Sequence, residues 1–204
     1  RLIPQKNQGV AAARNTGIAQ AQGTWIALLD QDDLWLPDKL AVQIEAVTAN
    51  PSLHWHYTAF TRFYNNGREV PKADGAHGRI ETMRRLLAGR LFIPPAASLV
   101  KTSACQTVGG FDSTIIPSDD WDFFLKLAER FECGYEPKRL TRFRSHPHST
   151  GKRQRNRIFE AQLVVLDRHA IAAREVVPQS VLNHRRANVL WHLGREHAAA
   201  GDKQ

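Results

Sequence analysis

The chain has 204 residues, of which 42% are hydrophobic and 24% are charged, so it can bury one good core. Its two cysteines, Cys105 and Cys133, are too few and too far apart for a disulfide scaffold or a zinc site, which indicates buried thiols in a reducing compartment. No apolar run approaches the length of a membrane span, and there is no signal-peptide pattern, so we expect a cytoplasmic protein. The chain opens at Arg1 and has one methionine, Met83, which leads us to expect a segment of a longer polypeptide.

Helices and strands are predicted to alternate in the first hundred residues. The expected elements are, in order, a helix over 9–21 with Asn7 as N-cap and Gly23 as stop, a strand over 24–29, a helix from Pro37 to Asn50, a strand over 53–64 before the turn Asn66-Gly67, a helix near 80–87, and a short strand from Ala97. A helix that leads into a short apolar strand is typical of parallel α/β sheets.

The second half is predicted to be mainly helical. The expected elements are a short helix over 103–108 closed by Gly109-Gly110, a helix capped by Ser118 with the apolar stripe Trp121, Phe124, Leu125, Ala128 and Phe131, a strand over 139–144, and two helices from about Arg155 separated by Pro178. The stripe places one face of the Ser118 helix in the core. We therefore expect one domain over residues 1–150 and a helical C-terminal extension over 151–204.

Three carboxylates, Asp30, Asp32 and Asp33, follow an apolar segment at the point where a buried strand should emerge. Uncompensated charge there is costly, so such a cluster usually holds a cation or a ligand. Hard oxygen donors at this spacing suit Mg²⁺ or Mn²⁺. An EF-hand loop is excluded, because its glycine would fall on Trp35 and its terminal glutamate on Ala41. The remaining structural interpretation is stabilisation of the next helix by first-turn acids.

A second acid cluster, Asp119, Asp120 and Asp122, lies in the expected first turn of the Ser118 helix. Favourable interaction with the helix dipole would by itself explain acids at this position. Trp121 adds an aromatic wall, and a carboxylate beside an apolar wall can have its pKa adjusted for general-base work. The residues alone leave these two interpretations open.

The stretch from Lys138 to Ile158 contains eight lysines or arginines and no acid, so it should attract anions. Within it Arg142, Arg144, His146 and His148 lie close together, and arginine presents a planar fork to phosphate oxygens. A solvated basic face is the plain alternative. A phosphate-rich ligand, an anionic membrane surface and nucleic acid are the anionic partners left open, with nucleic acid least favoured.

Taken in order, these segments resemble the motifs of the family 2 glycosyltransferases, inverting enzymes of the GT-A fold. The matching segments are residues 7–17 (N-x-G-x-x-x-A-R-N-x-G), 29–35 (acidic D-x-D-D-L-W), 109–112 (G-G-F-D), 119–122 (E-D-W-D) and 144–146 with Ser149 (late R-x-H loop). Each motif is weak alone, but five in the right order are specific. The resemblance implies an α/β GT-A fold, Rossmann-like, with a mixed sheet flanked by helices. Residues 1–150 would be a catalytic domain lacking its first βαβ part, and 151–204 its helical extension.

The resemblance also implies roles on the donor side of the site. Arg14 would approach the nucleotide base and Asp30 the ribose. Asp32, together with Asp33, would hold the Mg²⁺ or Mn²⁺ that bridges the donor diphosphate. His146 would steady the diphosphate or the metal. The donor implied is a nucleotide sugar.

On the leaving-group and acceptor sides, the resemblance implies that Arg144 steadies the diphosphate and that Asp120 is the general base for the acceptor hydroxyl. Asp119 and Trp121 would lie on the acceptor side. The family's usual glutamate is replaced here by Asp119, which is one methylene shorter, so Asp120 is the better candidate for the base.

The implied function is metal-dependent transfer of a sugar, with inversion, to a glycan or lipid-linked acceptor in cell-envelope polysaccharide biosynthesis. No Q-x-x-R-W motif is present in the chain, which favours transfer of single sugars. We expect the segment alone to be inactive and its full-length parent to be active, with peripheral contact at the inner face of the membrane. The alternatives are a non-catalytic anion-binding remnant and two-carboxylate glycoside hydrolysis, which needs neither metal nor nucleotide.

Overall fold

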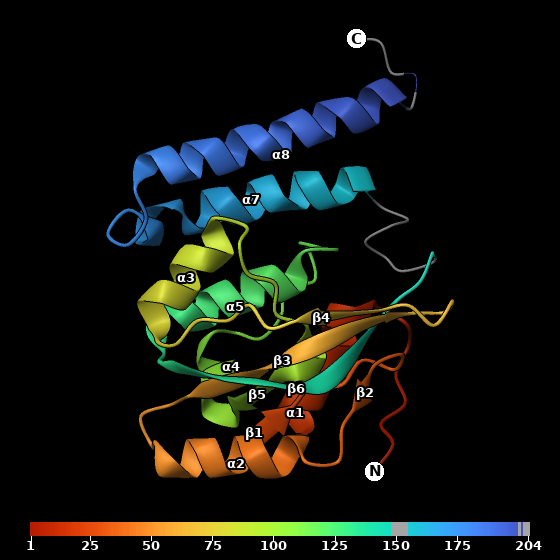
Figure 1. Ribbon diagram of the computed structural model, residues 1–204, viewed down its shortest axis with the longest axis vertical. Coiled ribbons are helices and arrows are strands. Elements are labelled where there is room, and N and C mark those ends of the chain that lie inside the picture. The colour runs from red at the N-terminus through yellow and green to blue at the C-terminus, as the bar shows by residue number, and fades with distance from the viewer. Residues whose placement is uncertain (148–154, 200, 202–204) are drawn as a thin grey trace.

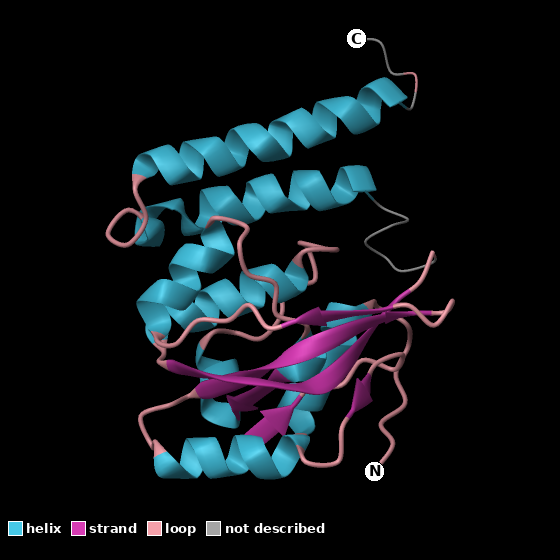
Figure 2. Cartoon of the chain, viewed as in Figure 1, coloured by secondary structure: helices cyan, strands magenta, loops and turns pink. Residues whose placement is uncertain are grey.

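A computed structural model of the chain describes residues 1–147, 155–199 and 201, which form a mixed sheet with helices on both faces (Figure 1, Figure 2). The strands are β1 (Trp25–Ala27), β2 (Leu34–Trp35), β3 (Trp55–Tyr64), β4 (Glu69–Lys72), β5 (Ser98–Lys101) and β6 (Cys133–Ser145). The helices are α1 (Val10–Gln20), α2 (Lys39–Ala49), α3 (Arg79–Leu87), the 3-10 helix η1 (Pro95–Ala97), α4 (Thr102–Thr107), α5 (Asp119–Arg130), α7 (Arg155–Ala173) and α8 (Gln179–Ala199). The expected α/β class with a mixed sheet is confirmed.

The strand order is β1-β5-β3-β6-β2, with β4 also paired to β3. β3 and β6 run parallel, and the other pairings within the described residues are antiparallel. The expectation of a parallel neighbour for the strand after the first helix is therefore wrong, because β1 pairs antiparallel with β5. A short apolar strand carries no information about the direction of its partner.

Strand β6 begins at Cys133, six residues before the predicted 139–144, because the strand continues through Pro137. Pro137 has no N–H for a sheet ladder, and the β3–β6 pairing skips from Glu136 to Arg139 at this point. This bulge keeps the proline out of the hydrogen-bonded register while the strand continues on both sides. Its far end, at Ser145, carries the basic loop toward the first acid cluster.

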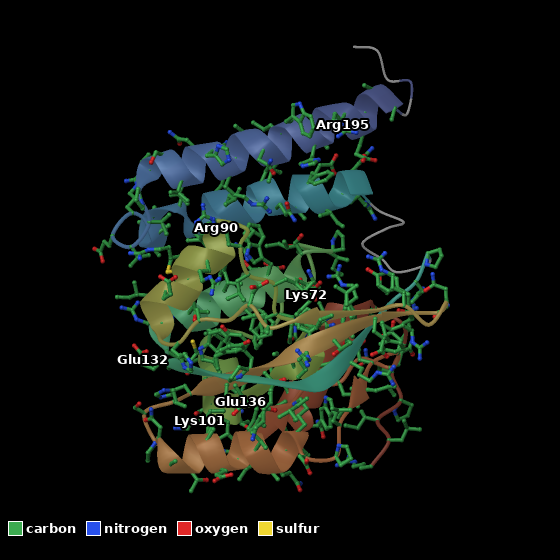
Figure 3. All side chains as sticks on the ribbon, viewed as in Figure 1. Lys72, Arg90, Lys101, Glu132, Glu136 and Arg195 are labelled. Carbon is green, nitrogen blue, oxygen red and sulfur yellow. The ribbon has the colours of Figure 1, made fainter. Side chains whose placement is uncertain are left out.

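The layers are visible in Figure 1, where α2 lies on one face of the sheet, α3 and α5 lie on the other, and α7 and α8 stack beyond them. Side chains fill the spaces between these layers (Figure 3). One hydrophobic cluster joins Trp55 of β3, Phe123 of α5, Val165 of α7 and Val189 of α8. The C-terminal helices therefore share the core of the sheet. The expected boundary at residue 150 falls outside the described residues.

The capping predictions are partly correct. Gly9, with φ of 90°, is the N-cap residue of α1, and Asn7 instead accepts a hydrogen bond from the Gly9 N–H (3.0 Å). Ser118 occupies the N-cap position of α5 as predicted, but its side chain makes no capping hydrogen bond. Glycine suits the first position because a side chain rarely adopts positive φ.

The expectation of buried cysteines is confirmed. Cys105 and Cys133 are free and buried, and burial raises the pKa of each thiol to about 12. Both thiols therefore behave as small apolar side chains. Among the described residues, no helix combines the length and the apolar character that a membrane crossing requires.

Candidate active site

Arg14 joins the two acid clusters into one site. Its Nη2 donates to both carboxylate oxygens of Asp30 (2.7 and 2.8 Å), and its Nη1 donates to Asp119 Oδ2 (2.9 Å). The guanidinium is largely buried, which lowers the pKa of Arg14, but the two carboxylates outweigh burial and the net pKa is raised. A single cation on α1 thus ties the turn after β1 to the first turn of α5.

The neighbouring Asn15 fixes α1 against the loop before α5. Its Nδ2 donates to the carbonyl of Phe111 (2.7 Å), and its Oδ1 accepts the Phe111 N–H (2.8 Å). Gly110 has φ of +65°, and a Cβ there would lie 2.4 Å from Asn15 Oδ1, so a side chain is excluded. The segments 7–17 and 109–112 therefore meet directly, and this contact orients Arg14.

The first acid cluster lies in a tight turn that Asp33 closes by donating its N–H to the carbonyl of Asp30 (3.1 Å). The Asp33 residue is only 4% exposed. Its Oδ1 accepts the Arg144 N–H (2.8 Å), whereas its Oδ2 is buried without a hydrogen-bond partner among the described residues. Burial raises the pKa of Asp33 to about 7, aided by the charges of Asp32 and Asp30 and opposed by the Arg144 N–H.

The end of β6 lies beside this turn. Arg144 Nε donates to the backbone carbonyl of Asp32 (2.9 Å), and His146 Nε2 lies 3.3 Å from Asp32 Oδ2. The Arg144 guanidinium also stacks over the Phe63 ring at 4.5 Å. The structure thus brings Asp32, Asp33, Arg144 and His146 together at one place. His148, which belongs to the same predicted loop, lies outside the described residues.

These residues fit a divalent cation only in part. No group of three or more histidine, cysteine, aspartate or glutamate side chains in the described chain is arranged to hold a metal. The unpartnered oxygen of Asp33 is nevertheless a buried acceptor that a cation would satisfy. Mg²⁺ sites commonly use one or two protein carboxylates and take further ligands from substrate phosphates. Asp32 and Asp33 could therefore contribute only part of the ligand set of such a cation.

Strand β2 and helix α2 anchor the turn that carries the first acid cluster. Trp35 Nε1 donates to the carbonyl of Ala96 (2.8 Å), and the Lys39 ammonium lies 4.5 Å from the Trp35 ring centre. Lys39 is fully buried and donates to Gln43 Oε1 (2.6 Å), and burial lowers its pKa to about 7. This buried network holds the residues that follow the first acid cluster.

In the second cluster, Asp120 is the carboxylate that has no cation at hydrogen-bonding distance among the described residues. Asp119 is paired with Arg14, while Asp120 Oδ1 accepts the N–H of Trp121 (2.8 Å). Burial raises the pKa of Asp120 to about 7, and the nearby Asp119 charge adds to this effect while Arg14 opposes it. A carboxylate with a pKa near neutrality is well matched to general-base catalysis.

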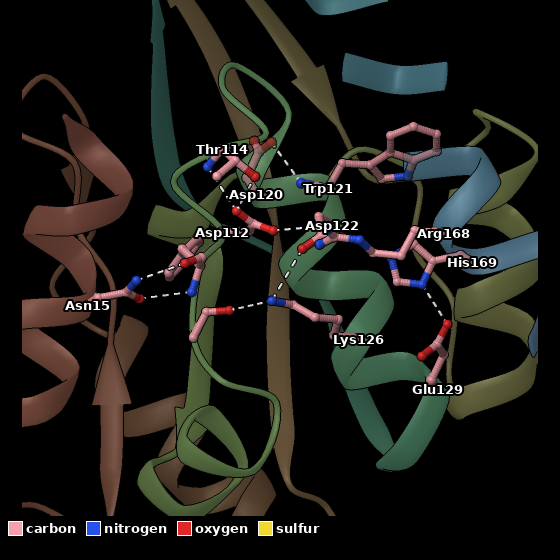
Figure 4. A network of polar contacts seen from close by, with 12 residues as sticks. Asn15, Asp112, Thr114, Asp120, Trp121, Asp122, Lys126, Glu129, Arg168 and His169 are labelled. Carbon is pink, nitrogen blue, oxygen red and sulfur yellow. Dashed lines mark hydrogen bonds and ion pairs between the residues drawn. The ribbon is translucent and has the colours of Figure 1, made fainter. Parts of the chain in front are cut away.

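Asp122 points to α7, a contact that the sequence did not predict. Its fully buried carboxylate lies within 3.2 Å of Arg168, His169 and Lys126 (Figure 4). Burial acts to raise the pKa of Asp122, but the hydrogen bond from His169 and the adjacent cations lower it on balance. Because Arg168 and His169 are more than forty residues away along the chain, no local pattern identifies this contact.

Trp121, predicted as an aromatic wall, is held by two helices. Its Nε1 donates to the carbonyl of Leu86 in α3 (3.2 Å), and the Arg185 guanidinium of α8 lies 5.7 Å from its ring centre. The side chain is therefore half-buried, with its indole N–H already satisfied.

The basic stretch is partly used within the protein. Arg142 forms an ion pair with Glu69, and Arg144 is engaged as described above. Residues 148–154 of the stretch lie outside the described part of the chain. The two arginines predicted to meet an anion are therefore already oriented by protein groups.

The mixed sheet, the carboxylate turn after β1 and the acid-bearing helix α5 occur in a chain whose fold is that of the GT-A glycosyltransferases. Solved structures share it. S. aureus TarS 1-349 in complex with UDP-GlcNAc aligns with a TM-score of 0.64 at 13% identity, over 93% of this chain and 54% of that one. Mannosyltransferase PcManGT from Pyrobaculum calidifontis in complex with GDP-Man and Mn²⁺ aligns with a TM-score of 0.56 at 16% identity, over 98% of this chain and 56% of that one.

The chain belongs to glycosyl transferase family 2, whose sequence profile matches residues 1–109. An uncharacterized glycosyltransferase of Haemophilus influenzae is 29% identical over 137 residues, covering 67% of this chain and 46% of the relative. One of Rickettsia felis is 39% identical over 151 residues, covering 71% and 23%. The Escherichia coli chondroitin synthase is 28% identical over 135 residues, covering 63% and 18%. The chain therefore spans less than half the length of these relatives.

Proposed function

We propose that the full-length protein transfers a sugar, with inversion, from a nucleotide-sugar donor to a glycan or lipid-linked acceptor, using Mg²⁺ or Mn²⁺. The Arg14 bridge between Asp30 and Asp119 carries the proposal, because it joins two acid clusters that differ in chemistry. Burial raises the pKa of Asp33 and of Asp120 to about 7, but their clusters differ in the cations beside them. Among the described residues Asp33 Oδ2 has no partner, whereas Asp122 Oδ2 lies 3.2 Å from the Lys126 ammonium. The complexes of TarS with UDP-GlcNAc and of PcManGT with GDP-Man and Mn²⁺ support the donor class.

In this proposal the donor lies along the first cluster. Asp30 keeps 27% of its side chain exposed, so it can accept a ribose hydroxyl while Arg14 orients its carboxylate and faces the base. Arg144, already held by the carbonyl of Asp32, would steady the diphosphate. Fixed cations at that position stabilise charge as it develops on the leaving diphosphate.

Asp32, Asp33 and His146 would hold the metal. When bound, a divalent cation supplies charge neutralisation of the leaving diphosphate. The side chains themselves contribute an oriented carboxylate, a buried oxygen that lacks a partner in the described residues, and an imidazole nitrogen 3.3 Å from Asp32 Oδ2.

Asp120 would take the proton of the acceptor. The acceptor oxygen forms a bond to the anomeric carbon from the face opposite the diphosphate, the bond from that carbon to the phosphate oxygen breaks, and the hydroxyl proton passes to the Asp120 carboxylate. Attack from the opposite face in one displacement inverts the anomeric carbon. Asp119 and Trp121 would line the acceptor side.

The deciding experiment compares two variants of the full-length protein. Asp120→Asn should lower turnover by about 10²- to 10⁴-fold while leaving donor affinity nearly unchanged, because only the proton acceptor is lost. Asp32→Ala should weaken donor binding in Mn²⁺ and have little effect on binding in chelator. Near-normal turnover of Asp120→Asn would refute the base assignment.

The 204-residue chain itself provides a separate measurement. Titration with nucleoside diphosphates in Mn²⁺ is expected to show weak binding and no sugar transfer, because the chain corresponds to less than half of its relatives. Micromolar affinity together with turnover would contradict this part of the proposal.

We place the protein in the cytoplasm, with peripheral contact at the inner face of an anionic membrane where a lipid-linked acceptor would be reached. Binding to anionic vesicles that falls with salt would support this contact. Steep salt dependence without any effect of Mn²⁺ or nucleotide would instead favour the anion-binding module. Sugar release without either would favour a glycoside hydrolase.

A further inference from the structure

Two acids in the predicted motifs, Asp112 and Asp122, have no part in the proposed chemistry, yet both are held by α7. Arg168 Nη2 donates to Asp112 Oδ2 (2.8 Å), and its Nη1 donates to Asp122 Oδ1 (3.1 Å) (Figure 4). The planar guanidinium therefore links the loop before α5 to the first turn of α5. Asp112 is itself oriented by the N–H and hydroxyl of Thr114 (2.8 and 2.6 Å).

The adjacent residue of α7, His169, makes a second link to the same helix. Its Nε2 lies 3.1 Å from Asp122 Oδ1, its Nδ1 lies 2.5 Å from Glu129 Oε1, and the residue is 1% exposed. Carboxylate oxygens only accept hydrogen bonds, so both ring nitrogens must carry a proton and the ring is an imidazolium. His169 thus spans two turns of α5 as a buried cation.

These contacts matter because Asp120 lies between two fixed points. Asp119 is held by Arg14 on one side, and Asp122 is held by α7 on the other. Asp120 Oδ1 accepts the N–H of Trp121 in its own helix. The position of this carboxylate therefore follows the position of the first turn of α5.

The clamp adds to the packing that holds α5. Phe123 and Phe124 follow the first turn and are buried in the core, and the Phe123 ring stacks on Phe111. The charged hydrogen bonds of Arg168 and His169 add directional restraints on Asp112 and Asp122, which apolar contacts do not supply.

We infer that Arg168 and His169 are positioning residues, which clamp the first turn of α5 through Asp112 and Asp122 and so set where Asp120 meets the acceptor hydroxyl. This inference rests on the proposed function for its catalytic consequence, but the clamp is a property of the fold. A displacement of a catalytic group by about 1 Å can lower a rate about 10²-fold, so a small loosening of this turn should be measurable.

The test uses three variants with two readouts. Arg168→Lys keeps the charge, but a single ammonium cannot bridge two carboxylates as the fork does. His169→Gln removes the double link. Leu166→Ala, in the same helix and buried in the core, is the control because it weakens packing without touching the clamp. Amide hydrogen exchange over residues 119–124 is measured on the chain itself, and turnover with donor KM is measured on the full-length protein.

We expect both clamp variants to speed exchange over residues 119–124 at least about 10-fold and to lower kcat at least about 10-fold with donor KM within about twofold. Leu166→Ala should lower Tm and leave both readouts close to wild type. Unchanged exchange in the clamp variants, or unchanged kcat despite a lower Tm, would overturn the inference. If the wild-type protein shows no transfer, the proposed function fails, and the exchange data alone decide whether the clamp exists.

Discussion

The two acid clusters contain the same kind of residue in the same number, but the structure surrounds them differently. In the cluster 30–33, the most buried carboxylate, Asp33, keeps an oxygen without a hydrogen-bond partner in the described chain. In the cluster 119–122, the most buried carboxylate, Asp122, is surrounded by three cationic side chains. Asp122 Oδ2 also lacks a hydrogen bond, but it lies 3.2 Å from the Lys126 ammonium, whereas Asp33 Oδ2 has no cation beside it in the described chain.

In the proposed function, this difference divides one residue type between binding and proton transfer. A buried carboxylate with an unused oxygen suits a metal, whereas a carboxylate placed between two neutralised neighbours has its pKa raised by burial and can accept a proton near neutral pH. Among the described residues, Arg14 forms ion pairs with both clusters. The same substitution, aspartate to asparagine, should therefore have opposite effects on stability in the two clusters.

The largest effect on stability is expected from Asp122→Asn. The change leaves Arg168 and His169 without the carboxylate that both contact, and breaking a buried ion pair typically costs about 3–5 kcal/mol. Denaturant unfolding of the 204-residue chain measures it. A decrease of less than about 1 kcal/mol in the free energy of unfolding would mean that Arg168 and His169 find other partners.

Arg14→Met should change the pH dependence of turnover in the full-length protein. In the proposed function Asp120 acts in its deprotonated form, so activity should rise as pH passes its pKa near 7. Because the Arg14 charge lowers that pKa, its removal should move the acidic limb to higher pH, with a greater loss of activity at about pH 6 than at about pH 8. A parallel loss at all pH values would show that Arg14 acts through donor binding alone.

Asp33→Asn should change the free energy of unfolding in the opposite direction from Asp122→Asn. Neutralising a buried carboxylate with a raised pKa should leave stability unchanged or raise it by about 1 kcal/mol, since the amide oxygen can still accept the Arg144 N–H. Metal-dependent nucleotide binding should fall at the same time. Thermal unfolding and titration with and without Mn²⁺ give the two measurements, and clear destabilisation would refute the contrast.

The smallest effect is the pH dependence of stability due to His169. Burial acts to lower the pKa of His169, but its hydrogen bonds to Asp122 and Glu129 raise it on balance. A raised pKa in the folded state means that the stabilisation is fully present below the unfolded value of about 6.5 and is lost as pH rises through the folded value. Unfolding free energies at about pH 6 and pH 9 should differ less in His169→Gln than in the wild type.

Much of the secondary structure could be predicted because its signals are local. The spacing of apolar residues located α2 and α5, alanine content located α1, and aromatic and β-branched content located the long strand β3. Glycines or prolines marked most of their ends. Strands β2 and β4 were not predicted, since Leu34–Trp35 follows directly on the acid cluster and Glu69–Lys72 contains two charged residues and a proline, so neither forms an apolar run. The first half of β6 was missed because Pro137 argues against a strand unless a bulge removes it from the ladder.

The amino-acid sequence by itself determined which residues carry charge, how they are grouped into motifs, and the family to which the chain belongs, because these properties depend on order along the chain. Only the tertiary structure decided that Arg14 joins the two acid clusters, that Asp33 keeps an unused oxygen, and that α7 holds α5. Partners separated by 46 to 105 residues meet only after the sheet and helices pack, and no local pattern encodes which cation reaches which acid.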